Sequence, residues 1–185
     1  MIATFTFPAD VEGYLWEPEG ELLFEAARRV PKEHVVVELG SYKGRSTICL
    51  AQGHDLVIAV DHFKGEQSIE PITQHFDHIT GDYRAEFERN LDKYGVRANV
   101  LVTPYDTVTA AKIWASKTVG LLFVDAAHDY ESVSQDLRAW LPLMAPEGYL
   151  ILDDVNTPGV GRAMKELDWE TIDTTQKMAI LRRKQ

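Results

Sequence analysis

The sequence lacks the features that define several large classes of protein. It has one cysteine, Cys49, which excludes a disulfide framework, and the apolar neighbours of Cys49 indicate a small core residue. No stretch approaches the roughly 18 apolar residues of a membrane span, and the first residues show neither a basic start nor a cleavage site. We therefore expect a cytoplasmic protein that does not enter a membrane.

Positive charge is scarce as well. The 185 residues include 19 Lys and Arg against 29 Asp and Glu, which gives a formal net charge of −10 at pH 7, and no block of basic residues stands out. This balance argues against bulk binding of nucleic acid. The length is that of one domain, residues 1–185, so we expect any active site to be built within it.

Short apolar runs alternate with stretches of helical periodicity along most of the chain. Purely apolar strands indicate that both faces of a sheet are covered, and the alternation of strand and helix indicates parallel strands. The predicted strands are 35–39, 56–60, 100–102, 119–124 and 149–152. The predicted helices between them are 44–52, 82–94, 107–116 and 131–143, after a first helix that starts near Pro18. This pattern predicts a doubly wound α/β fold.

The C-terminal part departs from the alternation. Two further strand-like runs, 169–173 and 177–181, are separated by three residues only. A connection this short leaves no room for a crossover helix, so the two strands must pair antiparallel. The sequence thus predicts a seven-stranded, mostly parallel sheet with one antiparallel strand at the C-terminus.

A glycine loop joins the first predicted strand to the next helix, and it spans Glu38 to Ser46. Gly40 allows a sharp turn and a close approach of backbone N–H groups to a ligand, whereas Gly44 allows tight packing of the helix start. The third glycine of a dinucleotide site is missing, which argues against an NAD dehydrogenase. The loop instead resembles the first motif of class I S-adenosylmethionine-dependent methyltransferases, whose Rossmann-like fold also ends in an antiparallel strand. The resemblance implies cofactor contacts at Glu38, Gly40, Ser41 and Gly44.

Polar residues follow the second and third predicted strands, and ligands of open α/β sheets bind at these carboxyl ends. Asp61 is placed to accept both ribose hydroxyls of an adenosine, with His62 and Phe63 beside the adenine face. Asp106 has two interpretations. Its carboxylate can accept the adenine amino group, or it can cap the helix that starts at Thr107.

Three more carboxylates, Asp125, Asp153 and Asp154, follow the fourth and fifth predicted strands. Gathered at one edge, they would raise one another's pKa unless a cation compensates them, and oxygen ligands suit magnesium, calcium or manganese. We predict a site for magnesium or another divalent cation. The alternative is that Asp153 or Asp154 caps the helix that opens near Pro158.

His128 lies three residues after Asp125 and is expected to project from the same strand end. An imidazole with a pKa near neutral can remove a proton from an acceptor hydroxyl as the methyl group arrives. His128 is therefore the predicted general base. The alternative is a loop histidine that caps the following helix.

With these residues in place, the chain from about Gly13 to its end resembles the small bacterial class I methyltransferases grouped as methyltransferase family 24. Five segments carry the resemblance, in order and at family-like spacing: 38–47, 60–63, 121–131, 140–148 and 158–160. Catechol O-methyltransferase and macrolide-type sugar O-methyltransferases are also similar, in the glycine loop or in the acids that follow the strands.

The likeness to the catechol enzyme implies roles for individual residues. It implies that the metal is held by Asp125, Asp153 and Asp154. It also implies that His128 stands in place of that enzyme's lysine base and that Ser46 binds the carboxylate of the cofactor. The sequence departs from the family at Ala127, where a second acid is common, and this leaves one metal ligand fewer.

We therefore predict an S-adenosylmethionine-dependent methyltransferase that acts, with a divalent metal, on a hydroxyl of a small molecule. Two alternatives stay open: a metal-independent enzyme that methylates nitrogen or a larger partner, and a non-catalytic module that binds the cofactor. The irregular stretch 64–81 is expected to lie over the substrate. Within the N-terminal segment, 1–17, the stretch Phe5–Trp16 is rich in aromatic residues and suggests a homodimer in which it covers a partner's site. The acceptor itself cannot be read from the sequence.

Overall fold

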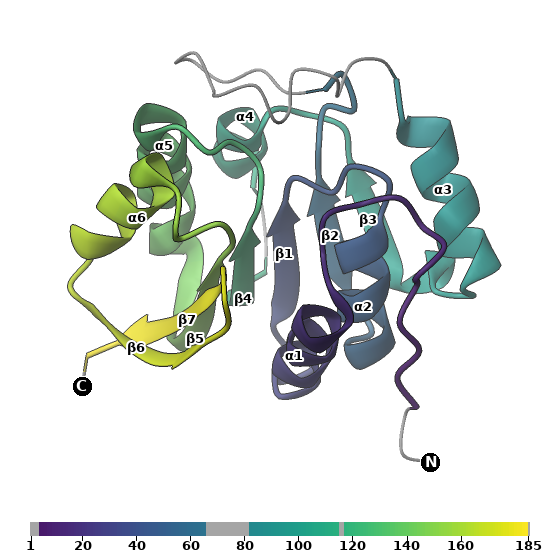
Figure 1. The fold of residues 1–185 in the computed structure, drawn as a ribbon, viewed down its shortest axis with the longest axis horizontal. Helices are drawn as coiled ribbons and strands as arrows, with labels where there is room; N and C mark the ends of the chain where they lie inside the picture. Colours follow the sequence, from purple (N-terminus) through teal and green to yellow (C-terminus); the bar gives the residue numbers. More distant parts are fainter. Residues whose placement is uncertain (1–3, 66–81, 115–116, 185) are drawn as a thin grey trace.

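The computed structural model describes residues 4–65, 82–114 and 117–184, and these form one sheet with helices on both faces (Figure 1). The strand order is β3-β2-β1-β4-β5-β7-β6. The strands are β1 (Val35–Leu39), β2 (Val57–Val60), β3 (Val100–Thr103), β4 (Val119–Val124), β5 (Met144–Leu152), β6 (Trp169–Thr174) and β7 (Ala179–Arg183). Strands β1 to β5 pair in parallel, and β7 runs antiparallel to both β5 and β6. The predicted fold class is confirmed.

Two apolar cores lie on opposite faces of the sheet, and each is closed by three helices. On one face lie α1 (Glu17–Arg28), α2 (Arg45–Gly53) and α3 (Arg84–Lys93); on the other lie α4 (Thr107–Lys112), α5 (Tyr130–Trp140) and α6 (Pro158–Lys165). Every residue of β1, β2 and β4 is buried, as their largely apolar character predicts. Cys49 is buried in the first core as a free thiol, as expected.

The ends of several elements differ from prediction. Strand β5 begins at Met144 rather than 149, because Met144 pairs with Val119 and the register then shifts before Leu121 pairs with Tyr149. The predicted fifth helix ends at Trp140, and 141–143 forms a 3-10 turn. Strand β7 begins two residues later than predicted, so 177–178 belong to the turn between β6 and β7. This last shift matters for the site.

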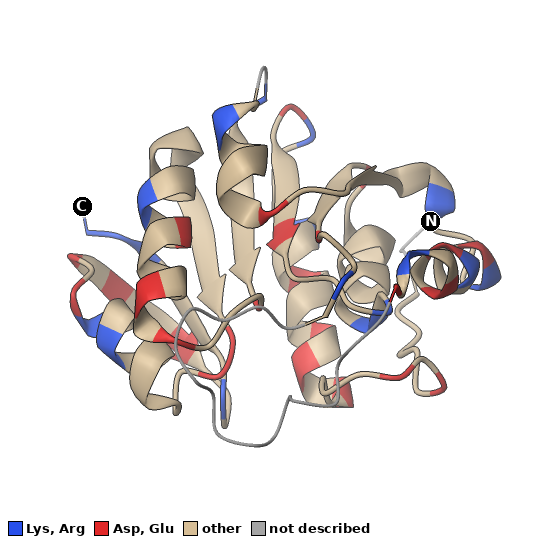
Figure 2. Ribbon diagram, turned by 90° about the horizontal axis from the view of Figure 1, so that it is seen from above, with Lys and Arg blue, Asp and Glu red and all other residues tan. Residues whose placement is uncertain are grey.

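The surface of the described part agrees with the composition. Within these residues no helix has the length and apolar character needed to cross a membrane. Lys and Arg are scattered over several elements and interspersed with Asp and Glu (Figure 2). The predicted substrate segment 64–81 lies outside the described residues from 66 onwards.

Candidate active site

A cavity of about 310 Å³ lies at the carboxyl ends of β1, β2, β4 and β5. The structure brings ten of the predicted site residues to its wall: Gly40, Ser41, Ser46, Asp61, His62, Asp106, Asp125, His128, Asp153 and Asp154. Glu38 and Gly44 do not line it. The N-terminal segment also contributes to the wall through residues 12–15, so it borders the cavity of its own chain, whereas the sequence suggested only that it covers a partner's site.

Gly40 brings the glycine loop directly onto the end of β4. Its φ of 84° is left-handed, and a methyl group on it would lie 2.2 Å from the Asp125 carbonyl oxygen and 2.7 Å from the Cα of Ala126. The Asp125 N–H donates to the Leu39 carbonyl at 2.8 Å. The predicted sharp turn is therefore present, and the backbone that approaches it closely is that of β4.

The buried side chain of Glu38 holds the glycine loop in place through hydrogen bonds. This side chain is fully buried, and Oε2 accepts hydrogen bonds from the Ser41 hydroxyl at 2.7 Å and from the Thr47 hydroxyl. Burial raises the pKa of Glu38 to about 7, although hydrogen bonds from Ser46, Thr47 and Ser41 oppose the shift. Within the described residues Oε1 has no hydrogen-bond partner. Glu38 thus shapes the loop, and its predicted contact with the cofactor stays a prediction.

Asp61 ties the same loop to the end of β2. Its Oδ2 accepts the backbone N–H groups of Ser41 and Tyr42, both at 2.9 Å, and its Oδ1 accepts that of Phe63 at 2.6 Å. A carboxylate has about four lone-pair sites, so capacity remains for a ligand in the cavity. The predicted ribose contact is compatible with this second task of holding the loop.

Asp106 caps α4, because its carboxylate accepts the Thr109 N–H at 2.8 Å. The capping interpretation is confirmed, and since Asp106 also lines the cavity, the contact with adenine stays a prediction. Asp136 of α5 was missed by the sequence because nothing marks it within its helix. It is buried at the cavity wall, accepts a hydrogen bond from the Thr107 hydroxyl, and burial raises its pKa to about 7.

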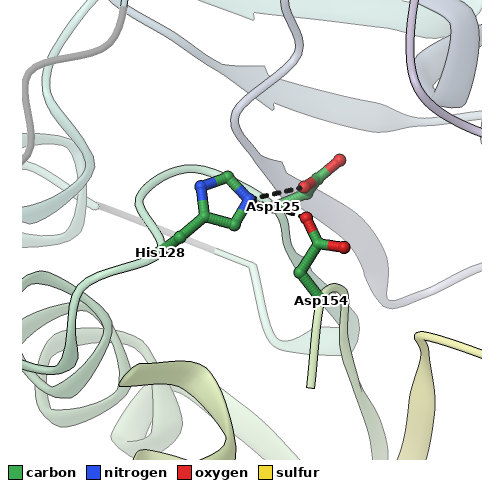
Figure 3. Close-up of side chains that lie close together, drawn as sticks. All are labelled: Asp125, His128 and Asp154. Atoms are coloured by element: carbon green, nitrogen blue, oxygen red, sulfur yellow. Dashed lines mark ion pairs between the residues drawn. The ribbon is translucent and has the colours of Figure 1, made fainter. Parts of the chain in front are cut away.

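The predicted base meets two of the predicted metal ligands across the end of the sheet (Figure 3). The Nε2 atom of His128 lies 3.0 Å from Asp154 Oδ2 and 3.8 Å from Asp125 Oδ1. One ligand atom from each of the three lies within 4.8 Å of the others. The capping alternative for His128 is wrong, because Asp129 is the N-cap of α5.

Asp153 and Asp154 do not cap α6 either, because the N-cap of that helix is Thr157. The residue that meets them is Lys177, which sequence reasoning placed in the last strand and did not single out. Its Nζ atom lies 2.5 Å from Asp153 Oδ2 and 3.7 Å from Asp154 Oδ1. Lys177 reaches the acids from the turn between β6 and β7 and does not line the cavity.

The acids at this edge differ in their affinity for protons. Burial, together with the charge of Asp153, raises the pKa of Asp125 well above its usual range. Burial also raises the pKa of Asp153, against the opposing charge of Lys177. Although burial opposes it, the hydrogen bond from His128 and the charge of Lys177 lower the pKa of Asp154. The cluster therefore has unlike carboxylates, with Asp154 the most readily ionised of the three.

Comparisons with known proteins agree with this architecture. The O-methyltransferase NovP has a TM-score of 0.74 at 20% identity, over 90% of this chain and 79% of that chain. The calicheamicin methyltransferase CalS11 has a TM-score of 0.69 at 18% identity, over 88% of this chain and 76% of that chain. TomG, an O-methyltransferase of Streptomyces achromogenes solved in complex with S-adenosylmethionine, has a TM-score of 0.64 at 18% identity, over 92% of this chain and 82% of that chain.

At these identities the structures establish the shared fold, and a family model establishes the family. The model, which describes a methyltransferase domain, matches residues 37–155 and thus more than half of the chain. The matched stretch includes the glycine loop, Asp61, and the cluster of Asp125, His128 and Asp154. The chain therefore belongs to methyltransferase family 24, among the class I S-adenosylmethionine-dependent methyltransferases.

Proposed function

We propose that the protein transfers the methyl group of S-adenosylmethionine to a hydroxyl of a small molecule. The observation that carries this proposal is that His128, paired with Asp154 at 3.0 Å, lines the same cavity as the glycine loop. The proton acceptor and the predicted cofactor contacts thus share one space. The net charge of −10 supports a small acceptor over nucleic acid.

The residues present suit the cofactor. A cavity of about 310 Å³ is within the range of small-molecule sites. Asp61 keeps acceptor capacity for the ribose hydroxyls, while Gly40, Ser41 and Ser46 form the side assigned to the methionine part. When bound, S-adenosylmethionine supplies a methyl group on a sulfonium, and the chain's task is to align an acceptor oxygen with it.

His128 is the proposed base of the reaction. With the cofactor bound, the imidazole of His128 would take the proton that the acceptor hydroxyl loses as the methyl group passes from sulfur to oxygen. The carboxylate of Asp154 at 3.0 Å and that of Asp125 at 3.8 Å then lie beside the imidazolium. The negative charge of Asp154, the most readily ionised acid of the cluster, stabilises the protonated ring.

The acid cluster also suits a divalent cation. Asp125 and Asp154 offer cavity-facing carboxylates, and within the described residues Asp153 Oδ1 is buried without a hydrogen-bond partner. Since Lys177 holds the other oxygen of Asp153, we propose Asp125 and Asp154 as the principal ligands. A cation held there would orient the acceptor oxygen and lower the pKa of its hydroxyl.

A second candidate is a methyltransferase that needs no metal. The observation in its favour is that Lys177 and His128 already place two basic groups against these acids. The two candidates differ in their response to a chelator. Turnover that stops in EDTA and returns with Mg²⁺ supports the metal-assisted reaction, whereas turnover that EDTA leaves unchanged supports the second candidate.

The direct test measures release of S-adenosylhomocysteine with a panel of hydroxylated small molecules. For an acceptor that reacts, His128→Asn is expected to lower kcat by about 10²- to 10⁴-fold, the usual contribution of a general base. Affinity for S-adenosylmethionine should stay unchanged. His34→Asn is the matched control, because His34 precedes β1 at the opposite end of the strand. Full turnover by the His128 variant would refute the proposed base.

A further inference from the structure

Arg45, the first residue of α2, holds the N-terminal segment against the glycine loop. Its guanidinium donates to four backbone carbonyls of that segment: Val11 at 2.5 Å, Gly13 at 2.7 Å, Leu15 at 3.0 Å and Ala9 at 3.3 Å. A guanidinium carries five N–H donors in a fixed planar fork, so a single side chain fixes the path of residues 9–15.

The same segment is fastened at further points. The Glu12 carboxylate accepts hydrogen bonds from the Tyr42 hydroxyl and from Lys43 Nζ, both at 2.7 Å. Val11 and Leu15 are 2% and 5% exposed, so their side chains belong to the core beneath. Residues 9–15 are thus seated on the chain's own glycine loop and α2.

The N-terminal segment, held in this position, forms part of the cavity wall. Residues 12–15 line it together with Gly40, Ser41, Ser46 and Arg45 itself. The glycine loop is the part of the site assigned to the methionine end of the cofactor. The segment therefore forms the part of the cavity wall that adjoins the loop at that end, and this assignment rests on the proposed function.

We propose that Arg45 is a positioning residue for cofactor binding. By seating residues 9–15 it builds the wall that encloses the methionine end, so the seated segment and the bound cofactor stabilise each other. Such coupling is reciprocal: a seated segment raises the affinity for the cofactor, and the cofactor reduces local opening of the segment. Lysine is a poor substitute, because its three donors share one atom and cannot span four carbonyls.

The test compares Arg45→Met and Arg45→Lys with the wild type and with Arg28→Met. Arg28 is the matched control, because it is a half-exposed arginine of α1 that pairs with Glu25. Calorimetry with S-adenosylmethionine should give a Kd about ten-fold weaker for Arg45→Met, equivalent to about 1.4 kcal/mol. Arg45→Lys should give an intermediate value, and the control should bind as the wild type does.

Hydrogen exchange separates positioning from general stability. The cofactor should slow amide exchange in peptides from residues 5–16 of the wild type and the Arg28 variant, and should fail to do so in Arg45→Met. Val11→Ser is a second variant, because Val11 anchors the segment but does not line the cavity. Val11→Ser should bind S-adenosylmethionine more weakly and should also lose the protection from amide exchange that the cofactor gives to residues 5–16.

Two results would overturn the inference. One is an unchanged Kd in Arg45→Met or in Val11→Ser, even with a lower melting temperature, because the residue would then be structural only. The other is protection by the cofactor in either variant equal to that of the wild type. A wild type that does not bind S-adenosylmethionine at all would instead overturn the proposed function, so the two failures are distinguishable.

Discussion

Replacing Gly40 by alanine tests whether the close approach of the glycine loop to β4 holds the site together. The added methyl group would lie 2.2 Å from the carbonyl oxygen of Asp125 and 2.7 Å from the Cα of Ala126. Both atoms are backbone, so a side-chain rotation cannot relieve the overlap. In the variant the loop must move away from β4. This movement would lengthen or break the 2.8 Å hydrogen bond from the Asp125 N–H to the Leu39 carbonyl.

The expected cost has two parts. Alanine at a φ of 84° loses about 1–2 kcal/mol relative to glycine, because its Cβ crowds the carbonyl oxygen. Overpacking against fixed neighbours adds about 1–3 kcal/mol. We therefore expect Gly40→Ala to lower the free energy of unfolding by about 2–5 kcal/mol in total.

Gly95→Ala is the matched control. Its φ of 68° is also left-handed, yet a methyl group there would meet no atom within 4 Å. Only the backbone part of the cost applies, so the two variants should differ by about 1–3 kcal/mol in urea unfolding. Equal destabilisation of the two would refute the role of close packing. Unchanged cofactor affinity in folded Gly40→Ala would show that the loop's position does not set the site.

Three further predictions concern carboxylates at or near the site. Because the folded pKa of Glu38 is raised to about 7 from 4.5, its stabilising contribution is full below about pH 4.5 and is lost as the pH rises through 7. As the pH rises from about 4.5 through 7, the free energy of unfolding of Glu38→Gln, measured in urea, should therefore increase relative to that of the wild type by up to ~3 kcal/mol. A difference that does not change with pH would contradict this. Lys177→Met should destabilise by about 3–5 kcal/mol, because it leaves Asp153 buried without its cation, and adding Asp153→Asn should recover most of the loss in the same assay. Asp106→Ser should keep the helix cap and the melting temperature but weaken the calorimetric Kd for S-adenosylmethionine several-fold; unchanged binding would leave capping as its role.

The sequence predicted the central strands more accurately than the start of β5, for a physical reason. Strands β1 and β4 are buried on both faces, so their runs of Val and Leu carry the information locally. The start of β5 depends on a partner instead. Pro146 and Gly148 argue against a strand, yet Met144 pairs with Val119 across the sheet and the strand extends to include them. Such pairing is a tertiary property that the local pattern does not contain.

The residues of the site also divide into those that the sequence could place and those that it could not. Asp61, Asp125 and Asp154 could be placed together because parallel strands end at one edge of the sheet. Lys177 and Arg45 could not be assigned, because their partners are distant in sequence: 24 residues separate Lys177 from Asp153, and 30 to 36 separate Arg45 from the carbonyls it binds. Nothing in the residues around either cation identifies its partner.

The predicted ligand-binding acids also hold the loops and side chains of the site in place, and this bears on how their variants should be interpreted. Asp61 binds three N–H groups of the loops around it, Asp153 binds Lys177, and Asp154 lies beside His128. Groups fixed in this way lose little further freedom when a ligand arrives, so preorganisation favours binding. Because Asp61→Ala would both release the loop and delete a ribose contact, lost activity alone cannot assign its role. Asp61→Asn keeps one oxygen acceptor for the loop, so a comparison of its cofactor affinity with its stability separates the two tasks.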